Sequence, residues 1–156
     1  MKKKDVLLLA HLRENSRVPL TELSRKTRLP VSSIHDRIRQ YSDGLMPRMS
    51  AMISFRKLGF STDAHVFLKA EKDRKDELMA RLLSCPFVNS CFKVNNGWDF
   101  MVECVFRDMC ACEEFIESME SLIANKEVHY VLDELKREAF LADPTFAEAI
   151  FDSAKL

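Results

Sequence analysis

The sequence has no run of 18 or more apolar residues, and it contains only three glycines and five prolines in 156 residues. The missing apolar run argues against a membrane-spanning helix. With 47% apolar residues and so few chain-breaking ones, the composition predicts a folded, well-packed protein rather than a disordered one. The first residues lack the cleavage site of a secretory signal, so we expect a cytoplasmic protein.

Groups that carry catalysis or bind metals are also sparse. The five cysteines are an odd number, which favours reduced, mostly buried thiols over a disulfide framework, and no second Cys/His pair has zinc-type spacing. The four histidines are scattered, and nucleophile-elbow, phosphate-loop and HExxH motifs are missing. We therefore predict no catalytic residues, no metal site and no cofactor.

The net charge of zero hides an asymmetry along the chain. Residues 1–60 carry 13 Lys/Arg against 5 Asp/Glu, an excess of 8 positive charges. Residues 61–156 carry 11 Lys/Arg against 19 Asp/Glu, an excess of 8 negative charges. Such a split suggests two units with different partners, and the basic one suits DNA.

Residues 1–54 have the pattern of a winged helix-turn-helix. Helices are predicted over 5–14 and 20–27, and a third begins between Pro30 and Ser33 and runs to about Tyr41. In the third helix an apolar stripe, formed by Val31, Ile34, Ile38 and Tyr41, would hold the helix against the other two. The other side chains would then read base edges in a major groove: Ser32, His35, Asp36, Arg39 and Gln40, with Ser33 and Arg37 on the flanks. An ordinary solvated helix face is the alternative.

The segment Leu45–Ile53, with Arg48 exposed, fits the wing that follows such a helix. Basic side chains near these elements are candidates for phosphate contacts, and each contact would add roughly 0.9 to the salt slope of binding. They are Lys2, Lys3, Lys4, Arg25, Lys26, Arg28 and Arg48. Lysines kept only for solubility are the alternative.

After a linker at 55–61, residues 62–141 alternate in type. Strands are predicted over 62–70, 87–94, 98–106 and 128–140, and helices over 73–85 and 108–125. Asn95-Asn96-Gly97 is a strong hairpin turn. The order β-α-β-β-α-β predicts a ferredoxin-like domain, so the whole chain is of the α+β class.

Two helices can cover only one face of a four-stranded sheet. Both faces of the strand 98–106 are apolar, with Met101 and Val105 on one side and Phe100, Val102 and Cys104 on the other. Because an apolar sheet face is not stable in water, we expect a second copy to cover it. The extension 142–156 is predicted to form a further helix that packs on the assembly through Phe146, Ala149, Ile150 and Ser153.

Several short motifs follow one another in a family-specific order over about 140 residues. The chain resembles the Lrp/AsnC, or feast/famine, family of prokaryotic transcription regulators. The family's recognition-helix pattern, Leu-Ser-x-Ser-x-Val-x-x-Arg-Ile, is matched by Leu29–Ile38. The wing and body patterns are matched by Gly44-Leu45-Met46, Ala51, Ile53, Leu58-Gly59 and Gly97-Trp98-Asp99.

The resemblance implies a sequence-specific DNA-binding regulator with a RAM-type ligand-binding domain. It also implies homodimers, with further assembly to tetramers or octamers, and a free amino acid as effector. The effector would bind between bodies at the hairpin loop, and the residues that correspond there are Asn95, Asn96, Gly97, Trp98 and Asp99. Gly97 would allow close backbone approach, and Asp99 could accept hydrogen bonds from an ammonium group.

Alternatives stay open from the sequence. The loop residues can also be read as a plain hairpin turn, and the regulator can act without an effector. The sirohaem decarboxylases, enzymes of the tetrapyrrole pathway, resemble this architecture, although only His129-Tyr130 matches their clustered His, Tyr and Arg residues. A co-regulator with a vestigial DNA-binding part is disfavoured by the eight excess positive charges.

Overall fold

The computed structural model describes residues 2–153, without the side chains of Glu148 and of residues 150–153. The chain forms two compact units. One contains the residues up to Ala51 together with those from Leu135 onward, and the other is Met52–Glu134. The second unit is therefore inserted in sequence between the two segments that form the first unit. No helix among the described residues is long and apolar enough to span a membrane.

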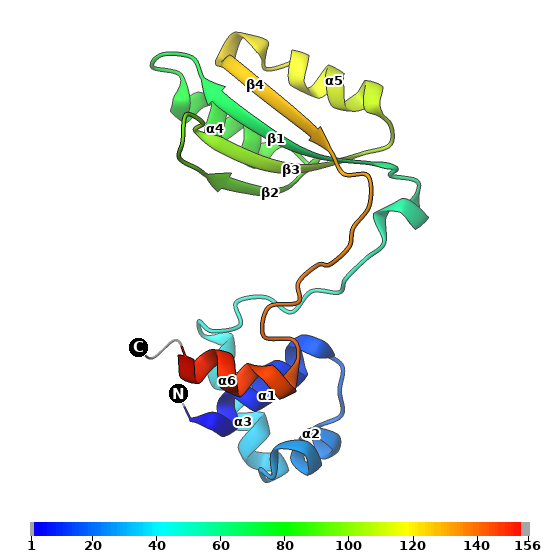
Figure 1. Cartoon of the computed structure of the whole chain (residues 1–156), viewed down its shortest axis with the longest axis vertical. Helices are drawn as coiled ribbons and strands as arrows, with labels where there is room; N and C mark the ends of the chain where they lie inside the picture. Colours follow the sequence, from blue (N-terminus) through cyan, green and yellow to red (C-terminus); the bar gives the residue numbers. More distant parts are fainter. Residues whose placement is uncertain (1, 154–156) are drawn as a thin grey trace. The chain divides into compact units, whose positions relative to one another are not determined.

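The first unit consists of helices (Figure 1). Its core is formed by Leu8 and Leu12 from the first helix, Leu23 from the second, Leu29 before the third and Ile34 within it. Pro19 and Pro30 immediately precede the second and third helices, where a missing N–H group costs nothing. The three predicted helices are thus confirmed. Their bounds are α1 Lys3–Glu14, α2 Leu20–Thr27 and α3 Val31–Ser42.

The segment 45–53, where the sequence placed the wing, is extended and carries no strand. Its first anchor is the Met46 N–H, which donates to the Tyr41 carbonyl at 2.8 Å. Leu45, Met49 and Met52 are exposed. A wing of paired strands needs a neighbouring strand, and the described part of this chain provides none for this segment.

The C-terminal helix α6, Pro144–Ser153, packs on α1 within the first unit. Ala147 is fully buried against Val6 and Ala10, because small side chains let the two helices approach closely. Phe146 and Ala149, on the face expected to pack on the assembly, are exposed in the single chain, so that packing stays a prediction. The side chains of Ile150 and Ser153 lie outside the described residues.

The second unit is a four-stranded antiparallel sheet in the order β2-β3-β1-β4, with helices on one face (Figure 1). This confirms the predicted β-α-β-β-α-β order. The strands are β1 Thr62–Ala70, β2 Val88–Lys93, β3 Phe100–Phe106 and β4 Ile123–Tyr130. The helices are α4 Lys75–Ser84 and α5 Met109–Glu117, with short 3-10 turns η1 Phe55–Leu58 and η2 Glu120–Leu122.

Two predicted elements of this unit have different bounds. The helix predicted to reach residue 125 ends at Glu117, and the strand predicted over 128–140 runs from Ile123 to Tyr130. The partner strand explains both changes. β1 pairs with β4 from Ala70 opposite Ile123 to Ala64 opposite Tyr130, so the chain must be extended from Ile123 onward and has no partner strand soon after Tyr130.

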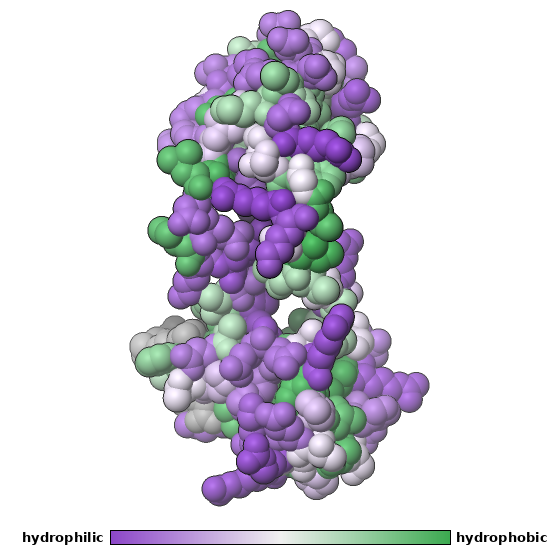
Figure 2. Space-filling model, turned by 90° about the vertical axis from the view of Figure 1, so that its right-hand side faces the viewer, coloured by the Kyte–Doolittle hydropathy of each residue, from purple (hydrophilic) through white to green (hydrophobic). Residues whose placement is uncertain are grey.

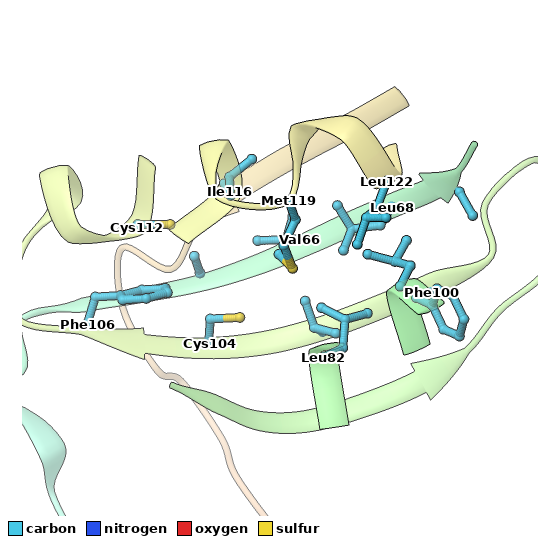
Figure 3. Close-up of a cluster of buried hydrophobic side chains, with 14 residues drawn as sticks. Val66, Leu68, Leu82, Phe100, Cys104, Phe106, Cys112, Ile116, Met119 and Leu122 are labelled. Carbon is cyan, nitrogen blue, oxygen red and sulfur yellow. The ribbon is translucent and has the colours of Figure 1, made fainter. Parts of the chain in front are cut away.

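The core of the second unit lies between the sheet and the helices α4 and α5 (Figure 3). Alternate residues of β1 and β3, such as Val66 and Val102, point into it. Cys104 and Cys112 are buried there, and burial raises the pKa of the Cys104 thiol to about 12. All five cysteines are free thiols, but only Cys104 and Cys112 are buried: Cys85 and Cys91 are half-buried, and Cys110 is exposed.

Candidate functional site

Helix α3 is held to the first unit by one face only. Ile34 is fully buried, while Ile38 and Tyr41 are half-buried in the same cluster. The turn before α3 is fastened by the Ser24 hydroxyl, which donates to the Leu29 carbonyl at 2.6 Å. Val31, expected in the apolar stripe, is 41% exposed.

The opposite face of α3 is polar and open to solvent. Ser32, His35, Asp36, Arg39 and Gln40 are all exposed, as the predicted helix orientation requires. Arg48 is exposed in the extended segment after α3. This face brings hydroxyl, imidazole, carboxylate, guanidinium and amide groups together on one helix. Such a set can make hydrogen bonds to base edges and phosphates.

Arg37 and Ser33 lie at the side of this face, and Arg37 points toward α1. Its guanidinium forms an ion pair with Asp5, a buried carboxylate in the first turn of α1. The Tyr41 hydroxyl donates to the same carboxylate at 2.8 Å, and so does the Lys2 amide at 2.9 Å. Asp5 was not among the functional residues predicted from the sequence. The one indication in the sequence is the four-residue spacing of Arg37 and Tyr41. This spacing puts both side chains on one face of the helix, where they can share a partner.

The basic side chains of the first unit are partly engaged within it. Lys26 pairs with Glu22 at 3.0 Å, which lowers the pKa of that carboxyl group, and Lys4 donates to the Arg28 carbonyl at 3.2 Å. Arg25 and Arg28 are exposed. Counted by compact unit, the first has 14 Lys/Arg against 9 Asp/Glu and the second 10 against 15, so the charge asymmetry persists as +5 and −5.

The hairpin between β2 and β3 carries the residues expected to bind an effector. It closes with the Val94 N–H donating to the Asp99 carbonyl at 3.1 Å. Asn96 and Gly97 have φ angles of 59° and 94°, the left-handed region that this turn requires. A Cβ at Gly97 would meet no atom within 4 Å, so the glycine is needed for its backbone angle rather than for space. Asn95, Asn96 and Gly97 are exposed.

Trp98 connects this turn to the open face of the sheet. Its ring lies 6.1 Å from that of Phe67, and the Phe67 ring lies edge-on to His129 at 5.8 Å. Phe92 is 47% exposed, and Met101, opposite both Phe92 and Phe67 in the sheet, is half-buried. The face without helices therefore carries an apolar cluster of Phe67, Phe92 and Met101, and beside it His65 and Glu103 lie 3.7 Å apart. Figure 2 shows apolar residues between polar ones on the surface of the molecule.

Asp99 points into the second unit rather than to solvent. It is 8% exposed, and its carboxylate accepts hydrogen bonds from the Ala70 amide at 3.1 Å and from Lys75 at 2.5 Å. Lys69 lies at 3.2 Å. The hydrogen bond from Lys75 above all, together with those from Ala70 and Lys69, lowers the pKa of Asp99 to about 2. The carboxylate is thus already paired, and it ties the hairpin to β1 and α4.

No group of three or more His, Cys, Asp and Glu side chains suited to a metal ion occurs within residues 2–153 as far as they are described. His129 and Tyr130 lie side by side in the sequence but on opposite faces of β4: His129 is exposed, while Tyr130 packs against the core and donates to Glu113 at 2.9 Å. The two side chains therefore form no joint site.

A basic helix-turn-helix unit joined to an acidic sheet unit of this topology defines a class of DNA-binding regulators. A winged helix-turn-helix DNA-binding model matches residues 1–43, and the model of the Lrp/AsnC ligand-binding domain matches residues 63–140. The chain belongs to the Lrp/AsnC family, and it is a DNA-binding transcriptional regulator of this type.

Known proteins agree with this assignment. The HTH-type transcriptional regulator FL11 of Pyrococcus furiosus is 26% identical over 129 residues, which are 82% of this chain and 85% of that protein. The regulator NMB0573 of Neisseria meningitidis, whose structure is a complex with L-Met, is 26% identical with a TM-score of 0.81. That match covers 88% of this chain and 93% of the other. LrpC of Bacillus subtilis shares the fold at 20% identity, with a TM-score of 0.80 and coverage of 87% and 97%.

The pairing of Asp99 predicts a specific acid sensitivity. Because its pKa falls to about 2 in the folded protein from an ordinary value near 4, its stabilising effect is full above pH ~4 and disappears as the pH falls toward 2. Asp99→Asn should therefore lower the free energy of unfolding by about 2 kcal/mol at pH 7, and by progressively less between pH 4 and 2. Urea unfolding at a series of pH values measures this. Asp76→Asn, at an exposed position of α4, is the control, and an Asp99→Asn deficit that does not change with pH would refute the explanation.

Proposed function

We propose that the exposed polar face of α3 reads the major groove of the DNA target. The observation that carries this is the one-sided burial of the helix: Ile34 faces the core while Arg39 and Gln40 face solvent. Arg39 can form two hydrogen bonds to a guanine and Gln40 two to an adenine. Exposed basic residues nearby, among them Arg28 and Arg48, would contact phosphates and set the salt dependence.

We infer further that two copies pair through the open face of the sheet. The support is the partly exposed apolar cluster of Phe67, Phe92 and Met101, which α4 and α5 do not cover. Burial of such a face is favourable by roughly 25 cal/mol per Å² of apolar area, before the costs of association. A dimer would present two copies of α3 to two half-sites of DNA. Further assembly to tetramers or octamers remains a prediction from the family resemblance.

We propose an amino acid as the effector, bound at the hairpin Asn95–Asp99. The support is the match of a ligand-binding domain over residues 63–140 and the L-Met complex of the Neisseria protein. In this chain the exposed turn and Trp98 would contact the ligand. The bonds already made by Asp99 suit it to holding the turn rather than to accepting the ligand's ammonium group.

We infer that the protein regulates without catalysing a reaction. The relatives are named as transcriptional regulators, and the one feature reminiscent of the tetrapyrrole decarboxylases, His129-Tyr130, is divided between two faces of the sheet. The observations favour a regulator over that enzyme.

Replacing Arg39 tests the proposal that α3 contacts bases in the major groove. Arg39→Ala should weaken binding to the preferred duplex by about 1–3 kcal/mol and relax the choice of base at one position per half-site, because a paired hydrogen bond to a base is lost. The preferred duplex is obtained by selecting tight binders of the unaltered protein from a random-sequence pool, and affinities are measured by fluorescence anisotropy. Arg81→Ala, exposed on α4, is the matched control. If the unaltered protein, Arg39→Ala and Arg81→Ala bind with equal affinity and selectivity, Arg39 does not contact the DNA bases.

The effector proposal can be tested with the single tryptophan of the chain. Because Trp98 is the only one, its fluorescence reports on the hairpin alone. Among the twenty amino acids, at least one should change Trp98 emission in a saturable way and raise the melting temperature of the same sample, since a ligand that binds the folded state stabilises it. In Trp98→Phe the emission signal disappears, which identifies its source. A screen without saturable emission change or thermal shift would contradict an amino acid effector at this loop.

A further inference from the structure

Arg37 and Tyr41 converge on one buried carboxylate at the junction of α1 and α3. Asp5 is 9% exposed, forms an ion pair with Arg37 and accepts a hydrogen bond from the Tyr41 hydroxyl. The Lys2 amide donates to its other carboxylate oxygen, as in a capping box, and so fixes the direction of the Asp5 side chain. We call Asp5, Arg37 and Tyr41 the Asp5 clamp.

The clamp adds what apolar packing cannot supply. Ile34 and Ile38 hold α3 against the core, but apolar contacts have little directional preference and allow a helix to rotate or slide by small amounts. Charge-assisted hydrogen bonds are short and directional. Because Arg37 and Tyr41 are one helical turn apart, a single fixed carboxylate holds two points along α3 and thereby its rotation about its axis.

That rotation decides where the reading side chains point. Arg39 and Gln40 lie between the two clamped positions in sequence, and each residue along a helix is turned by about 100° from the one before. Both are exposed, whereas Arg37 and Tyr41 are half-buried. A small rotation of α3 would therefore move the Arg39 and Gln40 side chains relative to base edges, and hydrogen bonds to bases do not tolerate such displacement.

We propose that Arg37 and Tyr41 are positioning residues, and that the Asp5 clamp sets the orientation of α3 from which Arg39 and Gln40 select a DNA sequence. This proposal rests on the proposed function of α3. It also revises the prediction that Arg37 contacts DNA. An Arg37 side chain that turned to a phosphate would leave the Asp5 carboxylate buried without its cation, which is strongly unfavourable.

The opposite role for Arg37, a direct phosphate contact, makes a different prediction for Asp5. If Arg37 binds DNA and Asp5 only competes for it, Asp5→Asn frees the guanidinium and removes a negative charge from the DNA-binding unit. Binding would then become tighter. If Asp5 orients α3, the same substitution weakens binding, although it makes the protein more positive. The sign of the change separates the two roles.

The experiment uses the full chain and the duplex selected by the unaltered protein. Asp5→Asn and Arg37→Gln should each weaken binding to this duplex by about tenfold and reduce its preference over a scrambled duplex. The double variant should be no worse than either single one, because both remove the same interaction. The slope of log affinity against log salt for Arg37→Gln should equal that of the unaltered protein, whereas loss of a phosphate contact would reduce it by roughly 0.9.

Two further variants control for folding. Asp43→Asn makes the same chemical change at an exposed position next to the C-terminus of α3 and removes the same negative charge, so it should bind at least as tightly as the unaltered protein. Tyr41→Phe removes one hydroxyl and keeps the ring. It should retain the circular dichroism spectrum and still lose part of the preference for the selected duplex.

The outcomes distinguish the positioning role of Arg37 and Tyr41 from the proposal that α3 binds the major groove. If the unaltered protein selects no duplex, the proposed function of α3 fails. If it selects one, and Asp5→Asn binds more tightly, or Tyr41→Phe keeps full preference, or Arg37→Gln shows the reduced salt slope, then the positioning role is wrong while α3 remains the reading helix.

Discussion

The burial of one face of α3 is the constraint on which the structure's function depends. Ile34 and its neighbours remove one side of the helix from water and so leave the other side, with Arg39 and Gln40, to face a partner. Apolar burial provides the attachment, and the paired carboxylate of Asp5 provides the direction. Both are needed, because a helix that contacts bases must be attached to its domain and must also keep a fixed orientation.

In the second unit, too, only one face is buried, here one face of the sheet. The helices α4 and α5 cover one side of the sheet, and the half-exposed Phe67 and Met101 remain on the other. Charged groups of this unit stabilise the hairpin that carries Trp98. Lys69 and Lys75 form ion pairs with Asp99, and the hydrogen bond from the Ala70 amide to Asp99 connects the hairpin to β1. The elements proposed for assembly and for effector binding are therefore adjacent, since the Trp98 ring packs beside Phe67 on the open face.

Local signals predicted much of this arrangement, and long-range contacts account for what they missed. Pro19 and Pro30 mark helix starts, and Asn96-Gly97 marks a turn, because their backbone preferences act within a few residues. The end of β4 depends on β1, some sixty residues earlier, and the buried face of α6 depends on Ala10 at the other end of the chain. For Arg37, helical periodicity gives only a position at the edge of the polar face. Its inward direction depends on Asp5, which no local pattern in α3 reveals.

Hydroxyl-radical footprinting of the full-length protein on its selected duplex tests the central claim most directly. Two copies that each insert α3 into a major groove should protect two half-sites on the same side of the duplex, with centres separated by one helical turn of about 10 base pairs or a multiple of it. The half-sites should be related by two-fold symmetry. Protection of a single site, or uniform protection without a preferred position, would contradict the account.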